Sequence, residues 1–124
     1  MKIIDIAFVA FPVTDLQRAK RFYEGTLGLK QTHVFGDEQT AWVEYDIGAG
    51  TLSIGNGAPA WKASRDGGTV GLEVEDFDAA VSRLREDGVA FLREPFETPV
   101  CRMAAVLDPD GNAIIIHKRM AGHS

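Results

Sequence analysis

The chain has little cysteine, no long apolar run and no excess of positive charge. Its single cysteine, Cys101, excludes an intramolecular disulfide and fits a reducing cytoplasm. No apolar stretch reaches the roughly 20 residues that a membrane-spanning helix needs. The net charge of -5 argues against a nucleic-acid partner and is compatible with a cationic ligand. We therefore expect a cytoplasmic protein whose partner is neither a membrane nor a nucleic acid.

The residues that are present fit one compact domain with one modest core. The chain has 124 residues, of which 45% are hydrophobic and 25% are charged. Its N-terminal stretch, MKIIDIAFVAFPVTD, has an acid inside the apolar run and a proline soon after. This pattern predicts a strand and not a signal peptide.

The two halves of the chain resemble one another. The segment FVAFPVTDLQRA begins at Phe8, and TVGLEVEDFDAA begins at Thr69. Each alternates like a strand, passes through Val-x-Asp and leads into an amphipathic helix. Further on, DIGAGTLSI from Asp46 is matched by DPDGNAIII from Asp108. The predicted helices also end alike, at GTLGL (25–29) and EDGV (86–89). These three correspondences, in the same order and at nearly one offset, indicate an internal duplication.

Each half is expected to fold as a βαβββ module. Turn residues and alternation predict strands over 4–12, 30–36, 40–47 and 51–55, and then over 69–75, 90–93, 101–107 and 113–118. A helix follows the first strand of each half, capped by Asp15 or Thr14 and by Asp76. The fold class is therefore α+β, with two tandem βαβββ modules whose mixed sheets form a cleft. One domain, 1–124, would consist of module 1–56, linker 57–67 and module 68–120.

The residues FPVTDLQRAKRFYEGTLGL, LEVEDFDAAVSRLREDGV and DPDGN carry a family resemblance. Their order and spacing, over most of the chain, resemble the vicinal oxygen chelate superfamily, which includes glyoxalase I, extradiol dioxygenases, fosfomycin-resistance enzymes and bleomycin-resistance proteins. The resemblance implies paired βαβββ modules and a homodimer. It says less about function, because one scaffold hosts many chemistries.

The resemblance also implies where metal-using relatives place their ligands. The corresponding positions here are Phe8, Ser53, Thr69 and Ile115. None of them is an imidazole or a carboxylate, and a divalent-metal site needs about three such ligands. We therefore expect no metal and no other cofactor, and we expect these four residues to line one ligand pocket.

Three further side chains are expected toward the sides or mouth of this pocket: Trp42, Glu73 and His117. Glu73 and His117 are either a carboxylate–imidazole pair that binds a ligand or transfers a proton, or solvated residues at the rim. Trp42 is either a stacking platform, as Trp61 also could be, or a core residue.

Two functions from different classes remain open. The first is a metal-independent protein similar to bleomycin-resistance proteins, with a role in antibiotic resistance, which sequesters a small organic and in some cases cationic molecule in a dimer cleft. The second is a lyase or isomerase resembling glyoxalase, or a dioxygenase-type enzyme, that uses relocated ligands such as Glu44, Glu73 and His117. An apolar cavity floor favours the first, and convergence of His117 with two acids favours the second. No residue is assigned a catalytic role.

Overall fold

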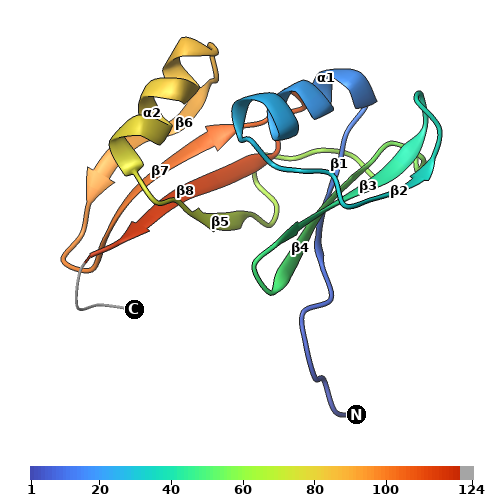
Figure 1. Cartoon of the computed structure of the whole chain (residues 1–124), viewed down its shortest axis with the longest axis horizontal. Helices are drawn as coiled ribbons and strands as arrows, with labels where there is room; N and C mark the ends of the chain where they lie inside the picture. Colours follow the sequence, from blue (N-terminus) through green and yellow to red (C-terminus); the bar gives the residue numbers. More distant parts are fainter. Residues whose placement is uncertain (121–124) are drawn as a thin grey trace. The chain divides into compact units, whose positions relative to one another are not determined.

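The structure, a computed structural model, describes residues 1–120 of the chain. It divides into two compact units, the first comprising residues 1–63 and the second beginning at Ser64. Each unit contains one four-stranded sheet and its own helix (Figure 1). The predicted α+β class with two βαβββ modules is therefore confirmed. Within residues 1–120, no helix combines the length and the apolar character needed to cross a membrane.

The first unit consists of β1 (Val9–Pro12), α1 (Leu16–Lys20), η1 (Arg21–Thr26), β2 (His33–Gly36), β3 (Ala41–Ile47) and β4 (Gly50–Gly55). The strand order is β1-β4-β3-β2, with β1 parallel to β4 and the other pairs antiparallel, so the sheet is mixed. The side chain of Asp15 accepts a hydrogen bond from the backbone N–H of Arg18 and caps α1. The helical segment continues through η1, a π-helical turn.

One face of this sheet packs against the helical segment. Tyr23 of η1 and Tyr45 of β3 are buried and stack with ring centroids 6.1 Å apart. Because side chains alternate along a strand, Val43 lies on the same face as Tyr45, and its register partner Ile54 joins it in the core. The opposite face of the sheet therefore presents the intervening residues, Trp42 and Glu44 of β3 among them.

The second unit repeats this arrangement with β5 (Val70–Glu73), α2 (Phe77–Glu86), β6 (Phe91–Glu97), β7 (Cys101–Leu107) and β8 (Ala113–Arg119). Its strand order is β5-β8-β7-β6, with β5 parallel to β8. Asp76 caps α2 by accepting a hydrogen bond from the N–H of Ala79. The guanidinium of Arg102 lies over the ring of Phe77, 4.6 Å from its centroid, which identifies the sheet face that α2 covers.

The strands predicted over 30–36 and 69–75 are each three residues shorter in the structure, at His33–Gly36 and Val70–Glu73. Two other predicted strands differ more from the observed ones. The first strand, predicted over 4–12, begins only at Val9. In the parallel register Val9 pairs with Leu52, and β4 starts at Gly50, so residues before Ala7 have no neighbouring strand in this sheet. The strand predicted over 90–93 extends instead from Phe91 to Glu97. Pro95 is tolerated there because β6 is an edge strand with register shifts on both sides of Arg93.

Candidate ligand-binding site

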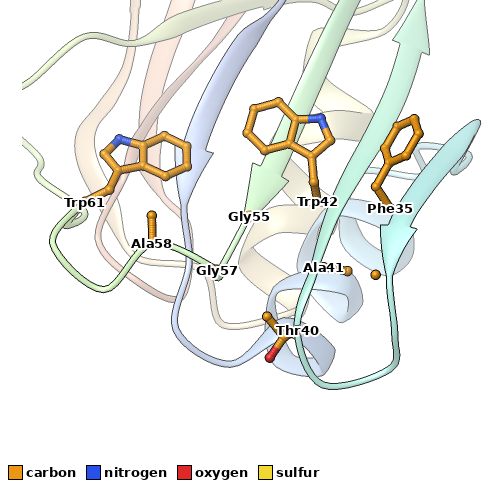
Figure 2. A pocket seen from close by; sticks show the side chains of 9 residues that line it. Phe35, Thr40, Ala41, Trp42, Gly55, Gly57, Ala58 and Trp61 are labelled. Atoms are coloured by element: carbon orange, nitrogen blue, oxygen red, sulfur yellow. The ribbon is translucent and has the colours of Figure 1, made fainter.

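The first unit contains a pocket of about 420 Å³ between the β2–β3 hairpin and the segment that follows β4 (Figure 2). Its walls are aromatic rings, glycines and small side chains: Phe35, Gly36, Thr40, Ala41, Trp42, Gly55, Gly57, Ala58 and Trp61. Cavities of roughly 300–1,000 Å³ with mostly apolar walls hold small organic ligands. This pocket has the size and the chemistry to bind such a molecule.

Trp42 is the central side chain of the pocket. Its indole lies edge-on to the ring of Phe8, with centroids 5.3 Å apart and planes inclined by 83°. It also stacks with Trp61, at a centroid separation of 6.3 Å and an angle of 25° (Figure 2). Aromatic faces of this kind attract flat rings and cations. The site can therefore bind a planar aromatic group by stacking.

Two glycines shape this pocket. Gly55 lies opposite Trp42 in the β3–β4 register, and a Cβ at Gly55 would come within 3.0 Å of Cε3 of the indole. Gly36 has a φ of +131°, and a Cβ there would come within 2.3 Å of the carbonyl oxygen of Thr40. The absence of side chains at these positions lets the indole lie across β4 and lets the hairpin close.

An acid lies beside the aromatic rings. Oε2 of Glu44 accepts a hydrogen bond of 2.9 Å from Nε1 of Trp42. The other carboxylate oxygen is 3.5 Å from Nδ1 of His33, whose ring stacks with that of Phe35 at 6.4 Å. The carboxylate orients the indole and places a negative charge near the pocket, which would favour a ligand with a cationic group.

Three of the predicted pocket residues lie in the first unit. Trp42 lines the pocket itself, and Phe8 contacts Trp42 without lining it. Ser53 is fully buried, opposite Glu44 in the register, and its hydroxyl oxygen has no hydrogen-bond partner among the described residues. Trp61, which the sequence offered as a stacking platform, is 38% exposed and lies at the pocket.

Sequence reasoning missed Phe35 and the stretch from Gly55 to Ala58. The sequence does contain a signal, since Gly36 directly follows Phe35, and Gly55 and Gly57 lie within the six residues before Trp61. The signal is weak without the register, because Phe35 meets Trp42 only through the pairing of β2 with β3.

The other four predicted pocket residues lie on one face of the second unit's sheet. They are Thr69, Glu73, Ile115 and His117. Thr69 precedes β5 and donates a hydrogen bond of 2.6 Å from its hydroxyl to the carbonyl oxygen of Ala113. Ile115 is half-buried, and its register partner in β5 is Gly71.

Glu73 and His117 are register partners on β5 and β8, and they form a pair. Nδ1 of His117 lies 2.5 Å from Oε1 of Glu73. Oε2 of Glu73 accepts a hydrogen bond of 2.8 Å from the backbone N–H of Arg119. These contacts, the backbone N–H first and the imidazole second, hold the pKa of Glu73 below its ordinary value. Such a pair can bind a ligand or accept a proton.

The residues at the family's ligand positions do not fit a metal ion. Phe8 and Ile115 have no donor atom, and the hydroxyl of Thr69 is engaged with the backbone. Across residues 1–120 no group of three or more His, Cys, Asp or Glu side chains could hold a metal ion. Neutral hydroxyls and hydrocarbon side chains are poor ligands for Zn²⁺, Ni²⁺ or Fe²⁺.

Comparison with known proteins places these features in a family. Residues 5–116 match the family described as the Glyoxalase/Bleomycin resistance protein/Dioxygenase superfamily. The anthracycline biosynthesis protein DauV of Streptomyces sp. (strain C5) is 36% identical over 112 residues, which are 86% of this chain and 38% of that protein. The chain thus spans well under half the length of this curated relative.

Two solved structures are also similar. TnmS3, an antibiotic binding protein from Streptomyces sp. CB03234, is 29% identical, with a TM-score of 0.77 over 97% of this chain and 99% of that one. A glyoxalase/bleomycin resistance protein from the same organism is 30% identical, with a TM-score of 0.71 over 90% of this chain and 98% of that one. The likeness extends over nearly the whole of both solved chains.

Proposed function

This chain belongs to the glyoxalase/bleomycin resistance protein/dioxygenase superfamily, and we propose that it is a metal-independent binding protein that sequesters a small organic molecule. The observation that carries the proposal is the stacked pair of Trp42 and Trp61 in a pocket of about 420 Å³. A planar aromatic group bound there would gain stacking on the indoles. A cationic substituent would gain the attraction of Glu44.

The nature of the ligand is proposed from a relative. TnmS3, which shares 29% of its sequence with this chain, is an antibiotic binding protein. We infer that the ligand here is also of the antibiotic class, that it is flat over part of its structure, and that sequestration in the cytoplasm protects the cell. No cofactor is needed for this role, because binding alone removes the free compound.

The experiment is a calorimetric titration with a planar anthracycline and with cationic bleomycin. Stacking on an aromatic side chain contributes roughly 1–3 kcal/mol per ring. We therefore expect Trp61→Ala to weaken binding of at least one of the two compounds by about tenfold. Leu92→Ala is the matched control, because Leu92 lies in the second unit and is 40% exposed, close to the 38% of Trp61. Equal affinity for the wild type and Trp61→Ala, or no binding of either compound, would overturn the proposal.

A second candidate function is an enzyme similar to glyoxalase, and the Glu73–His117 pair is the observation that favours it. The third proposed ligand, Glu44, is engaged by Trp42 in the first unit. The test is turnover of a hemithioacetal of an α-keto-aldehyde by protein purified without chelator. Turnover by the wild type that disappears in His117→Asn would support the enzyme. If the wild type shows no turnover, the binding protein remains the proposed function.

We further propose that the protein works as a homodimer with the pocket in the cleft that the two copies form, as the family resemblance implies. Support comes from the segment before β1, where Ile3, Ile4 and Ile6 are 82%, 85% and 75% exposed. A second copy would remove this apolar surface from water. Sedimentation equilibrium at micromolar concentration is expected to give a dimer, and the double variant Ile4→Asp/Ile6→Asp a monomer. A monomeric wild type would contradict the proposal.

A further inference from the structure

Asn56 is the first residue after β4, and its side chain is bonded to the β2–β3 hairpin. Its Oδ1 accepts a hydrogen bond of 2.9 Å from the backbone N–H of Ala41. Its Nδ2 donates a hydrogen bond of 2.6 Å to the carbonyl oxygen of Gln39. The side chain is half-buried and lies outside the lining of the pocket. Its two bonds nevertheless join the two segments between which the pocket lies.

The side chain of Asn56 replaces a backbone group in the β3–β4 ladder. The paired register ends at Trp42 and Gly55, so the next opposed residues are Ala41 and Asn56. Opposed residues of a hydrogen-bonded antiparallel pair exchange two backbone hydrogen bonds. Here the N–H of Asn56 donates to the carbonyl oxygen of Ala41 at 3.3 Å, whereas the N–H of Ala41 donates to the side-chain oxygen. Because a side chain completes the pair, the main chain can leave the sheet at this residue.

After Asn56 the chain turns away from the sheet and carries Trp61 to the pocket (Figure 2). The N–H of Trp61 donates to the carbonyl oxygen of Ala58 at 2.9 Å, which closes a turn with Pro59 at its second position. Proline has the backbone angle that this position needs, so the turn is stiff. Gly57 is the one residue between Asn56 and the turn. The place of the indole therefore depends on where the amide of Asn56 is held.

The hairpin loop holds the partner of the amide in place. Oδ1 of Asp37 accepts hydrogen bonds from the backbone N–H groups of Thr40, at 2.8 Å, and Gln39, at 2.9 Å. The N–H of Asp37 donates in return to the carbonyl oxygen of Thr40 at 2.9 Å. Thr40 itself lines the pocket. The carbonyl oxygen that receives Nδ2 of Asn56 thus belongs to an ordered loop that forms one wall of the pocket.

We propose that Asn56 is a positioning residue of the pocket, which fixes the segment that carries Trp61 against the hairpin and so holds the two indoles in their stack. Asparagine suits this role because its short side chain offers an acceptor and a donor at once. Asn56 acts through Trp61 and does not touch the ligand. A planar group then meets indoles that are already aligned, and binding does not have to order this segment. The effect on binding rests on the proposed function, whereas the alignment of the indoles does not.

The free protein gives the first readout. Two stacked indoles produce an exciton couplet in circular dichroism, and its loss in Trp61→Phe identifies it, since the chain has two tryptophans. Asn56→Ala should also lose the couplet, because it releases the segment from the hairpin. Gln17→Ala is the matched control. Nε2 of Gln17 donates a hydrogen bond of 2.8 Å to the carbonyl oxygen of Glu38, which ties the same loop to α1 and not to the segment of Trp61. This variant should keep the couplet.

A conservative variant tests the amide itself. In Asn56→Asp the carboxylate still accepts from the N–H of Ala41, but at neutral pH it cannot donate to the carbonyl oxygen of Gln39. The couplet should therefore be weaker at neutral pH and should recover at a pH of about 4, where the introduced carboxyl is protonated and donates again. The wild type at both pH values is the reference. A variant that is weakened equally at both pH values would contradict the role of the Nδ2 bond.

The second readout is calorimetric affinity for the planar anthracycline and for bleomycin. Asn56→Ala should weaken binding of whichever compound Trp61→Ala weakens, and Gln17→Ala should not. A couplet of wild-type size in Asn56→Ala, an equal loss in Gln17→Ala, or unchanged affinity in Asn56→Ala for a compound that needs Trp61 would overturn the inference. If the wild type binds neither compound, the proposed function fails, while the couplet still decides the role of Asn56.

A measurement on the wild type covers a variant that does not fold. In proton–nitrogen NMR, one Nδ2 hydrogen of Asn56 should exchange with solvent more slowly than the side-chain amide hydrogens of Gln31, which is exposed. Slow exchange supports the bond to Gln39 in solution. Equal exchange rates at the two side chains would refute that bond and the inference with it.

Discussion

Trp42 donates a hydrogen bond from Nε1 to Oε2 of Glu44, two residues farther along the same strand, at 2.9 Å. Residues two apart on a strand share a face, so both side chains lie on the side of the sheet away from the helical segment. Glu44 is itself approached by Nδ1 of His33 at 3.5 Å. The carboxylate therefore holds the plane of the indole that lines the pocket, and the position of Trp42 depends on it.

Removing this carboxylate should loosen Trp42. A typical hydrogen bond contributes about 0.5–1.5 kcal/mol, so Glu44→Ala should let the indole leave its observed orientation. In a Trp61→Phe background Trp42 is the single tryptophan, since the chain has two. We expect acrylamide to quench its fluorescence about twofold more efficiently in Glu44→Ala. Glu44→Gln keeps an acceptor oxygen and serves as the control. Equal quenching in all three proteins would show that Glu44 does not hold the ring.

The close approach of Gly55 to Trp42 predicts a steric effect. Gly55→Ala would place Cβ 3.0 Å from Cε3 of the indole, so the ring must move. Overpacking of this kind costs about 1–3 kcal/mol, and we expect a fall of that order in the free energy of unfolding, measured with urea. Gly50→Ala, in the same strand, is the control, because its Cβ would be 3.7 Å from the nearest atom. If both variants lose the same amount, the contact with Trp42 is not the cause.

Removing the hydroxyl of Ser53 and removing that of Thr69 should change the stability of the fold in opposite directions. The oxygen of Ser53 is buried without a partner within residues 1–120, so Ser53→Ala removes an uncompensated polar group. We expect the free energy of unfolding to rise by about 1 kcal/mol. Thr69 donates its hydroxyl hydrogen to the carbonyl oxygen of Ala113, and Thr69→Val should lower the same quantity by a similar amount. A loss of stability in Ser53→Ala would mean that this hydroxyl has a partner in solution.

Much of the fold could be predicted from local patterns. The Val-x-Asp motif followed by an amphipathic segment predicted where both helices begin. In the structure Asp15 and Asp76 do cap these helices. Strand alternation put Trp42 and Glu44 on one face. The first strand was predicted too long because the apolar run of residues 4–8 has the right composition, whereas pairing depends on where β4 begins. Composition does not report the position of a neighbouring strand.

The candidate site was less accessible to prediction. The pairing of Glu73 with His117 follows from a parallel first and fourth strand within one module, so the sequence could suggest it. Phe35 could not be found this way, since it meets Trp42 only through the hairpin register. The path of the chain after β4, which brings Trp61 to Trp42, is also a tertiary property. Alternation identifies a face, but it does not identify which loop covers that face.

The low pKa of Glu73 predicts how stability varies with pH. A carboxyl whose pKa is lower in the folded state than in the unfolded chain stabilises the fold above the unfolded pKa, and this contribution is lost as the pH falls through the folded value. The ordinary pKa of the group is 4.5 and the folded one is lower. We therefore expect the stability advantage of the wild type over Glu73→Gln to be present above pH 4.5 and to be lost only as the pH falls below 4.5. An advantage that stays undiminished in strong acid, far below pH 4.5, would contradict the assigned contacts.

The two contacts of Glu73 can be separated by changing only one of them. The backbone N–H of Arg119 is the larger cause of the lowered pKa, and the imidazole of His117 is the smaller one. In His117→Asn, the N–H of Arg119 remains 2.8 Å from Oε2 in an unchanged strand pair. The pKa of Glu73, followed by carbon NMR of its carboxyl group, should therefore rise in this variant but stay below its ordinary value. A complete return to the ordinary value would show that His117 dominates, and that the carboxylate depends on the imidazole more than on the strand.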